Sequence, residues 1–206
     1  MKNIITTLVV TLSLTLSFSQ NKTLFGIKAG LNISDVSGAS AFVDNEKLSR
    51  LHFGLLSELP VSEKFSMQLE LLYSQQGDYN YIVYNGISRS SAIENGKPIM
   101  QKYEIDYLQL PVLAKYYISR SFSIEIGPTI GVMIYDSYKR ALNRTNEIEL
   151  SGISGLSYKF SKSFFGSVRY THAITNAFRE PKEYYNKSSY SNGKNNVFQF
   201  SVGYIF

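Results

Sequence analysis

Histidine is the first residue type to consider for chemistry, since the chain contains no cysteine and only two histidines, His52 and His172. A histidine beside a hydroxyl can activate it as a nucleophile. His172 with a nearby Ser or Asp would therefore suit a hydrolase or acyltransferase dyad. Neither a GxSxG elbow, an HExxH pair nor a phosphate-binding loop accompanies it. We therefore interpret both histidines as structural residues and predict no catalytic residue and no enzyme activity.

Acidic residues offer the next candidate, a cation site. Asp35, Asp44 and Glu46 lie in one polar segment, but their spacing is not that of a dedicated calcium loop. The absence of cysteine also excludes Cys-based zinc and redox sites and a disulfide framework. We expect neither a metal nor a cofactor.

Tyrosines make one late segment suited to interaction. Tyr184, Tyr185 and Tyr190 lie among lysines and asparagines between residues 182 and 192. Tyrosine supplies amphipathic contact area at low entropic cost. One hypothesis is that this segment contacts a partner or a polysaccharide. The other is that it is a variable loop with no fixed role.

The net charge gives no sign of nucleic-acid binding. The formal value is +5, but Lys and Arg are scattered and cluster neither in a run nor on one helical face. We expect no nucleic-acid partner.

Residues 1–19 have the parts of an export signal. Lys2 makes the start positive, an apolar stretch runs over 4–16, and serines occupy the two positions that signal peptidase inspects. The apolar stretch is shorter than the about 20 residues that a membrane-spanning helix needs. We expect residues 1–19 to be removed, which leaves 20–206 as one domain.

Alternation of apolar and polar residues dominates the rest of the chain. In 25–33 every odd residue is apolar and every even one is glycine or polar, which is typical of a strand with two different environments. The same pattern recurs, with few exceptions, over 51–59, 65–74, 107–116, 122–134, 150–159, 167–171 and 198–206. About eight strands result, an even number, as in bacterial single-chain barrels.

The connections between these strands alternate in length. Short turns are expected at 60–64, 119–121 and 160–163. Longer polar segments occupy 34–47, 77–101, 137–147 and 176–194. Outer-membrane barrels have short periplasmic turns and long extracellular loops. With a periplasmic N-terminus, every short turn here would be periplasmic.

The polar face of the strands distinguishes a lipid-facing barrel from a soluble one. A Lys or Arg that faced lipid would cost about 2 to 4 kcal/mol near the midplane, so we expect charged side chains to pair inside a narrow barrel. The expected interior network consists of Lys28, Glu70, Lys115, Glu125, Lys159 and Arg169. The alternative is a soluble secreted barrel, in the manner of lipocalins, that turns its apolar face inward around a ligand.

The predicted fold is therefore an all-β, transmembrane, antiparallel up-and-down β-barrel of about eight strands. An open edge cannot persist in hydrocarbon, so the strand that begins near Leu24 must pair with the strand that ends at Phe206. Such a barrel is just wide enough for side chains to fill, which argues against an open pore. Pro111 and Pro128 each remove a ladder donor, so we expect β-bulges or strand ends at both.

Several segments resemble known outer-membrane barrels. The last strand, VFQFSVGYIF, ends in an aromatic residue, the feature that the assembly machinery reads in such proteins. GIKAGLN at 26–32, QLELLYSQQG at 68–77, YLQLPVLAKYY at 107–117 and Gly127-Pro128 are similar to segments of the PorT-like outer-membrane β-barrel family of Bacteroidota. The resemblance covers nearly the whole mature chain and implies a location more than an activity, although some members are linked to type IX secretion and gliding.

The expected function follows from fold and resemblance together. We expect a non-enzymatic protein of the cell outer membrane, structural or accessory, that interacts through its extracellular loops. The expected partners are outer-membrane lipid and lipopolysaccharide, the barrel assembly machinery during insertion, and an envelope or secretion-system protein.

Overall fold

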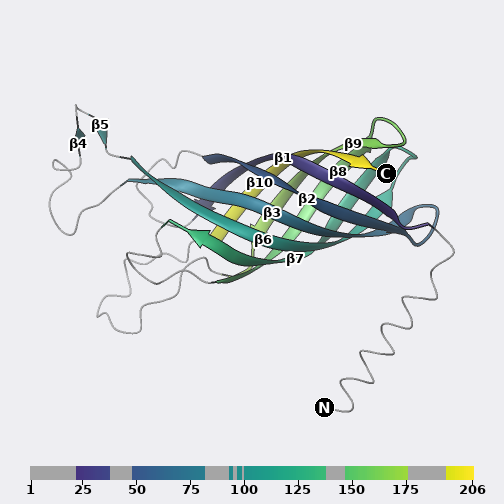
Figure 1. The fold of residues 1–206 in the computed structure, drawn as a ribbon, viewed down its shortest axis with the longest axis horizontal. Coiled ribbons are helices and arrows are strands. Elements are labelled where there is room, and N and C mark those ends of the chain that lie inside the picture. Colours follow the sequence, from purple (N-terminus) through teal and green to yellow (C-terminus); the bar gives the residue numbers. More distant parts are fainter. Residues whose placement is uncertain are drawn as a thin grey trace, which may run out of the picture.

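The computed structural model describes residues 22–37, 48–81, 93–94, 97–98, 100–137, 147–175 and 194–206. These residues form strands joined by turns (Figure 1), and no helix among them is both long and apolar enough to cross a membrane. The long strands are β1 (Leu24–Ser37), β2 (Leu48–Pro60), β3 (Phe65–Tyr81), β6 (Met100–Tyr117), β7 (Phe122–Asp136), β8 (Ile148–Lys159), β9 (Phe164–Ala173) and β10 (Lys194–Ile205). A separate two-stranded sheet joins β4 (Ile93–Glu94) to β5 (Lys97–Pro98).

The eight long strands close into one antiparallel barrel in the order β1-β10-β9-β8-β7-β6-β3-β2. The first and last strands pair from Gly26 with Ile205 to Ser37 with Lys194. The predicted closure is therefore confirmed, and the ladder has no free edge, which is the requirement that a hydrocarbon environment imposes.

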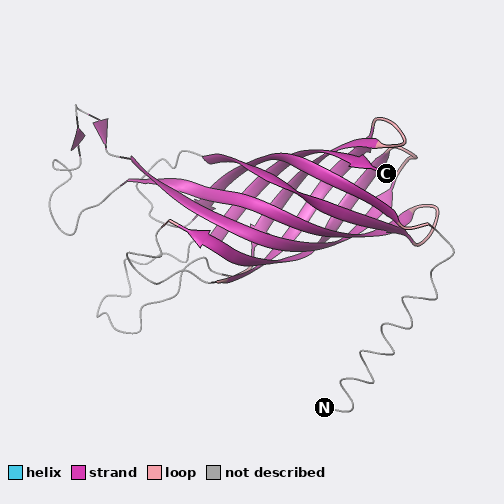
Figure 2. Cartoon of the chain, viewed as in Figure 1, coloured by secondary structure: helices cyan, strands magenta, loops and turns pink. Residues whose placement is uncertain are grey.

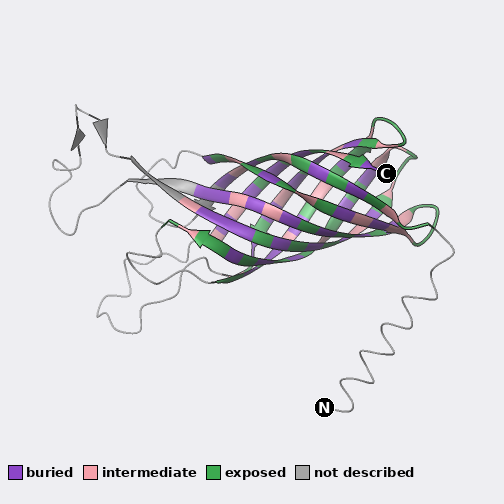
Figure 3. Ribbon diagram, in the orientation of Figure 1, coloured by how far each residue is buried: buried purple, intermediate pink, exposed green. Residues whose placement is uncertain are grey.

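Along most of each strand, buried residues alternate with exposed or partly exposed ones (Figure 3). The alternation is interrupted in β6, where Ile105, Asp106 and Tyr107 are all buried. The exposed face is apolar, and Ile126 and Val202 are 63% and 66% exposed. The buried face carries most of the charged and amide side chains of the strands. A lipocalin-like barrel needs the opposite arrangement, with an apolar interior, so that alternative is wrong.

Several strands are longer than the alternation predicted, including β3 and β6. The segment 77–101 was expected to be a polar connection, but β3 continues to Tyr81 and β6 begins at Met100. Their backbones stay paired there, for example Asp78 with Tyr103. Backbone pairing between two adjacent strands needs no apolar face. The hydrogen-bond ladder between β3 and β6 therefore extends beyond the residues that alternate between apolar and polar.

The prolines do not produce the expected bulges. Pro111 pairs with Thr129 and Pro128 with Gly152, both well inside their strands. Each proline leaves a short gap in one neighbouring ladder, and the same register resumes beyond it. The one register shift between β6 and β7 lies at Asp106/Tyr107. The missing N–H of each proline therefore removes only a local part of the ladder, because the strands on both sides hold the extended backbone in place.

The two ends of the barrel differ. The three short turns and the C-terminus lie together at one end (Figure 2). Strands β1, β3, β7 and β9 end at the opposite end, and β2, β6, β8 and β10 begin there. The segregation of short and long connections in the sequence therefore corresponds to the two ends of one barrel.

Candidate functional site

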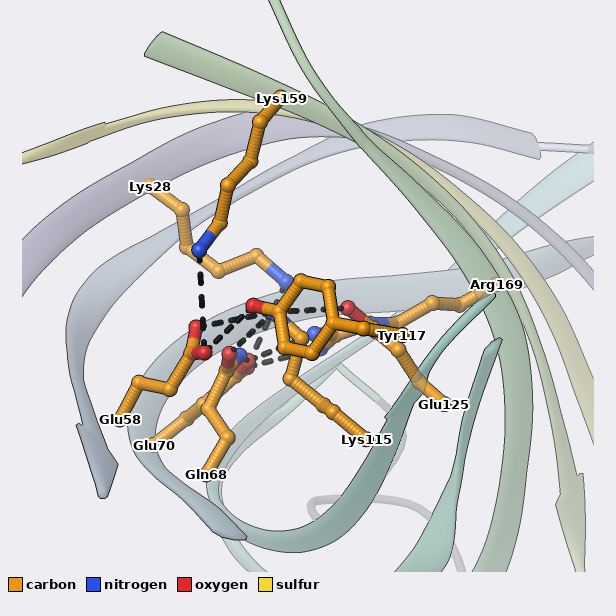
Figure 4. A network of polar contacts seen from close by, with 9 residues as sticks. All are labelled: Lys28, Glu58, Gln68, Glu70, Lys115, Tyr117, Glu125, Lys159 and Arg169. Carbon is orange, nitrogen blue, oxygen red and sulfur yellow. Dashed lines mark hydrogen bonds and ion pairs between the residues drawn. The ribbon is translucent and has the colours of Figure 1, made fainter. Parts of the chain in front are cut away.

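The centre of the barrel interior is occupied by one arginine and two glutamates. Arg169 on β9 donates through both terminal nitrogens to Glu70 on β3, at 2.8 and 2.7 Å, and through Nε to Glu125 on β7 at 2.6 Å. Strands β9 and β3 are diametrically opposite in the barrel order. The Arg169–Glu70 pair therefore spans the full width of the lumen (Figure 4).

Strand alternation explains why these charges meet. Glu70, Glu125 and Arg169 each occupy an inward position between apolar outward neighbours, and each is at most 1% exposed. A buried charge is costly unless it is paired and hydrogen-bonded. The two parallel N–H···O bonds of the guanidinium to one carboxylate are among the stronger ways to meet that requirement.

Two lysines extend this central group. Lys28 Nζ lies 3.4 Å from Glu70, and Lys115 Nζ lies 3.1 Å from Glu58 and 3.5 Å from Glu125. The fully buried part of the network thus balances three cations, Lys28, Lys115 and Arg169, with three carboxylates, Glu58, Glu70 and Glu125. We call this set the lumen network.

Lys159 lies at the edge of the network, toward the short turns. Its Nζ is 3.8 Å from Glu58, its side chain is 23% exposed, and it sits 4.7 Å above the ring of Tyr117. The Tyr117 hydroxyl also donates to Glu58. The structure therefore places all six residues of the expected network in one connected cluster. Glu58, Gln68 and Tyr117 complete this cluster.

Further polar contacts inside the barrel involve residues outside the lumen network. His52 Nε2 is 2.8 Å from Ser201 Oγ, and both residues are buried. Asn195 donates to Gln76 and to Glu149. Sequence spacing could not have paired these residues, because their strands are separated in the chain and meet only on closure.

His172 does not form the dyad that its sequence neighbourhood allowed. Its Nδ1 is 2.6 Å from Asn196 Oδ1, and its ring stacks on Tyr170 at the outer surface. Among the described residues, neither a serine nor an aspartate is hydrogen-bonded to it. His52 has a serine partner instead, but that pair is enclosed in the lumen.

Some predicted residues cannot be placed. Tyr184, Tyr185 and Tyr190 lie outside the described residues, and so does the expected signal segment 1–19. Within the described part of the chain, no three His, Cys, Asp or Glu side chains are grouped as a metal site would require.

Comparison with known proteins identifies the family and the fold. A family model described as outer membrane protein beta-barrel domain matches residues 18–179. Neisserial surface protein A has 9% identity and a TM-score of 0.56, with 90% of this chain and 100% of that chain covered, which shows a shared fold. Ail of Yersinia pestis (12% identity, TM-score 0.49, 90% and 100% covered) and OprG of Pseudomonas aeruginosa (14%, 0.47, 89% and 95%) are also similar. No curated protein matches the sequence.

Proposed function

The chain belongs to the family of outer membrane proteins with a β-barrel domain, and from this premise we propose that it is a sealed, non-enzymatic barrel that carries interaction loops. The apolar outer face is the surface that lipid covers in such proteins. The barrel therefore acts as a rigid membrane support, and contact with other molecules occurs at its ends.

Ion pairs that cross the lumen are the observation that supports the sealed state. Arg169 and Lys159 each reach a carboxylate on the diametrically opposite strand, at Glu70 and Glu58. These pairs cross the lumen at two levels, and buried glutamine and serine side chains lie beside them. An ion that crossed the barrel would have to break these pairs.

Conductance across a planar lipid bilayer tests this proposal. The inserted wild-type barrel, identified by its faster migration in unboiled than in boiled gel samples, is expected to give no stepwise current. Long-lived current steps that scale with the amount of inserted wild-type protein would contradict the sealed state.

The proposed orientation has the N-terminus and short turns in the periplasm and the long connections outside the cell. It is supported by the gathering of all three short turns at one end and by the usual arrangement of outer-membrane barrels. Export through the signal segment 1–19 and assembly by the barrel machinery belong to the same proposal. Outer-membrane lipid and lipopolysaccharide would then surround the barrel.

Trypsin added to intact cells tests this orientation. Cleavage is expected in 176–193, which contains Arg179, Lys182 and Lys187, while the short turns stay protected until the outer membrane is permeabilised. Protection of 176–193 in intact cells, with cleavage only after permeabilisation, would reverse the orientation. Tyr184, Tyr185 and Tyr190 lie in the same segment, so the treatment also disrupts the proposed contact surface.

A more specific role is proposed from sequence resemblance alone. The PorT-like segments of Bacteroidota barrels, such as GIKAGLN at 26–32, support a place beside the type IX secretion apparatus as an accessory envelope protein. Deletion of the gene should then reduce secretion of type IX substrates, and unchanged secretion would exclude this role while leaving the sealed barrel intact.

A further inference from the structure

The three short turns share one sequence pattern. They read VSEKF at 61–65, ISRSF at 118–122 and FSKSF at 160–164. Each begins with an apolar residue, continues with serine, contains one basic residue and ends with phenylalanine. We call these three segments together the collar.

The turns also share one backbone geometry. In each, the N–H of the first residue donates to the carbonyl of the fifth, at 2.8 Å for Val61, 3.0 Å for Ile118 and 2.9 Å for Phe160. In two of them the serine side chain adds a further bond, since Ser119 Oγ and Ser161 Oγ accept from the N–H of the fifth residue at 3.1 and 3.0 Å. The pattern therefore encodes one defined turn three times.

Each turn is fastened to the strand beside it. The carbonyl of its fourth residue accepts an N–H from the next strand, in the pairs Lys64–Tyr117 (2.8 Å), Ser121–Lys159 (2.8 Å) and Ser163–Ile205 (2.7 Å). The collar thus continues the barrel ladder. Its backbone is held by one hydrogen bond that closes each turn and by another to a neighbouring strand.

The apolar residue of each turn continues the outer apolar surface. Strand alternation puts Ile118 and Phe160 on the same outward face as Tyr116 and Tyr158, and the two residues are 56% and 66% exposed. The ring of Phe160 packs edge-on against Tyr158, with centroids 5.4 Å apart. The collar therefore begins where the lipid-facing surface ends.

The charged residues of the collar are predominantly basic. Lys64, Arg120 and Lys162 are exposed, and none forms an ion pair with a residue that the structure describes. Glu63 is the one acidic residue in these turns. Three exposed cations thus lie within a few residues of exposed apolar side chains, on turns whose backbone is hydrogen-bonded.

We propose that the collar binds the anionic headgroups of phospholipids at the membrane surface, with Lys64, Arg120 and Lys162 on the phosphates and the apolar residues at the acyl boundary. Basic residues near an anionic bilayer surface are attracted to it, and side chains that combine apolar and polar parts favour this depth. Which membrane leaflet the collar contacts depends on the orientation proposed above. Binding of anionic headgroups by the collar does not depend on that orientation.

Thermal unfolding in lipid nanodiscs tests the collar. The wild-type barrel should show a higher midpoint, followed by far-ultraviolet circular dichroism, in nanodiscs that contain phosphatidylglycerol than in phosphatidylcholine alone. Added salt should reduce that shift, because it screens exposed charges. The triple variant Lys64→Gln/Arg120→Gln/Lys162→Gln should lose most of the shift while it keeps the wild-type midpoint in phosphatidylcholine.

Matched variants separate charge from folding. Lys64→Arg/Arg120→Lys/Lys162→Arg retains all three charges and should retain the shift, and Glu63→Gln should retain or increase it. If the wild type shows no shift, or if the triple Gln variant keeps it, the proposal is wrong, and an acidic protein surface becomes the better partner for these cations. If the wild-type chain itself does not form a barrel in phosphatidylcholine, the proposed function is contradicted instead.

Discussion

Replacement of Arg169 with methionine is expected to lower the free energy of unfolding by about 3 to 5 kcal/mol, the typical effect of removing one partner from a buried ion pair. The guanidinium binds Glu70 twice and Glu125 once, and all three side chains are buried. Methionine fills a similar volume but donates no hydrogen bond. Glu70 then keeps a hydrogen bond from Gln68 and its contact with Lys28, and Glu125 keeps its contact with Lys115. Both lysine contacts are longer than the arginine bonds, at 3.4 and 3.5 Å.

This loss is measured by titrating the protein with urea in lipid vesicles. The folded fraction is followed as the amount of protein in the compact band of unboiled gel samples. Lys159→Met is the matched control, since Lys159 also reaches across the lumen but is partly exposed and 3.8 Å from its carboxylate. Its effect should be much smaller. Adding Glu70→Gln to Arg169→Met should recover part of the stability, because the numbers of buried cations and carboxylates are then equal again. If Arg169→Met is as stable as the wild type, the lumen network does not stabilise the barrel.

A charge on the outer face should be nearly as harmful. Ile130 lies in the middle of β7, is half exposed, and pairs with Leu110 and Leu150 on the neighbouring strands. Ile130→Arg would place a cation near the bilayer midplane, where the expected cost is about 2 to 4 kcal/mol. Urea titration in lipid vesicles gives this cost directly.

The position of the substitution provides the control. Ile148 is also exposed and apolar, but it is the first residue of β8 and lies toward the end opposite the short turns. Ile148→Arg should cost only about 0 to 1 kcal/mol, because the penalty falls near the interface. A similar loss at both positions would mean that depth in the bilayer does not decide the cost, which contradicts the lipid-facing assignment.

The sequence was sufficient for the faces and the closure of the barrel. Alternation alone assigns Leu31 and Phe200 outward and Lys28 and Gln199 inward, because side chains reverse at every residue of a strand. The need to leave no edge in hydrocarbon then requires that the first and last strands pair. Both inferences depend on local pattern and on a general property of the bilayer.

The partners inside the barrel could not be read in the same way. Glu70 and Arg169 are 99 residues apart, and His52 and Ser201 are 149 apart. Which inward residues face each other depends on the stagger between all intervening strands, and no single segment contains that information. The bulge at Asp106/Tyr107 is likewise a property of two strands together. The repeated turn pattern, in contrast, was present in the sequence and would have been found by aligning the short turns.

The side-chain contact between β3 and β9 across the lumen also bears on how the molecule is assembled. Because Arg169 enters the chain long after Glu70, an intermediate that contains only the first strands holds an acidic group without its guanidinium. Pairings of such long sequence separation form slowly, since a large loop must close before they gain anything. The three bonds of Arg169 therefore form only when β9 has joined the barrel, so a stalled or shortened chain lacks their stabilisation. Such a chain should remain an easier substrate for proteolysis than the finished barrel.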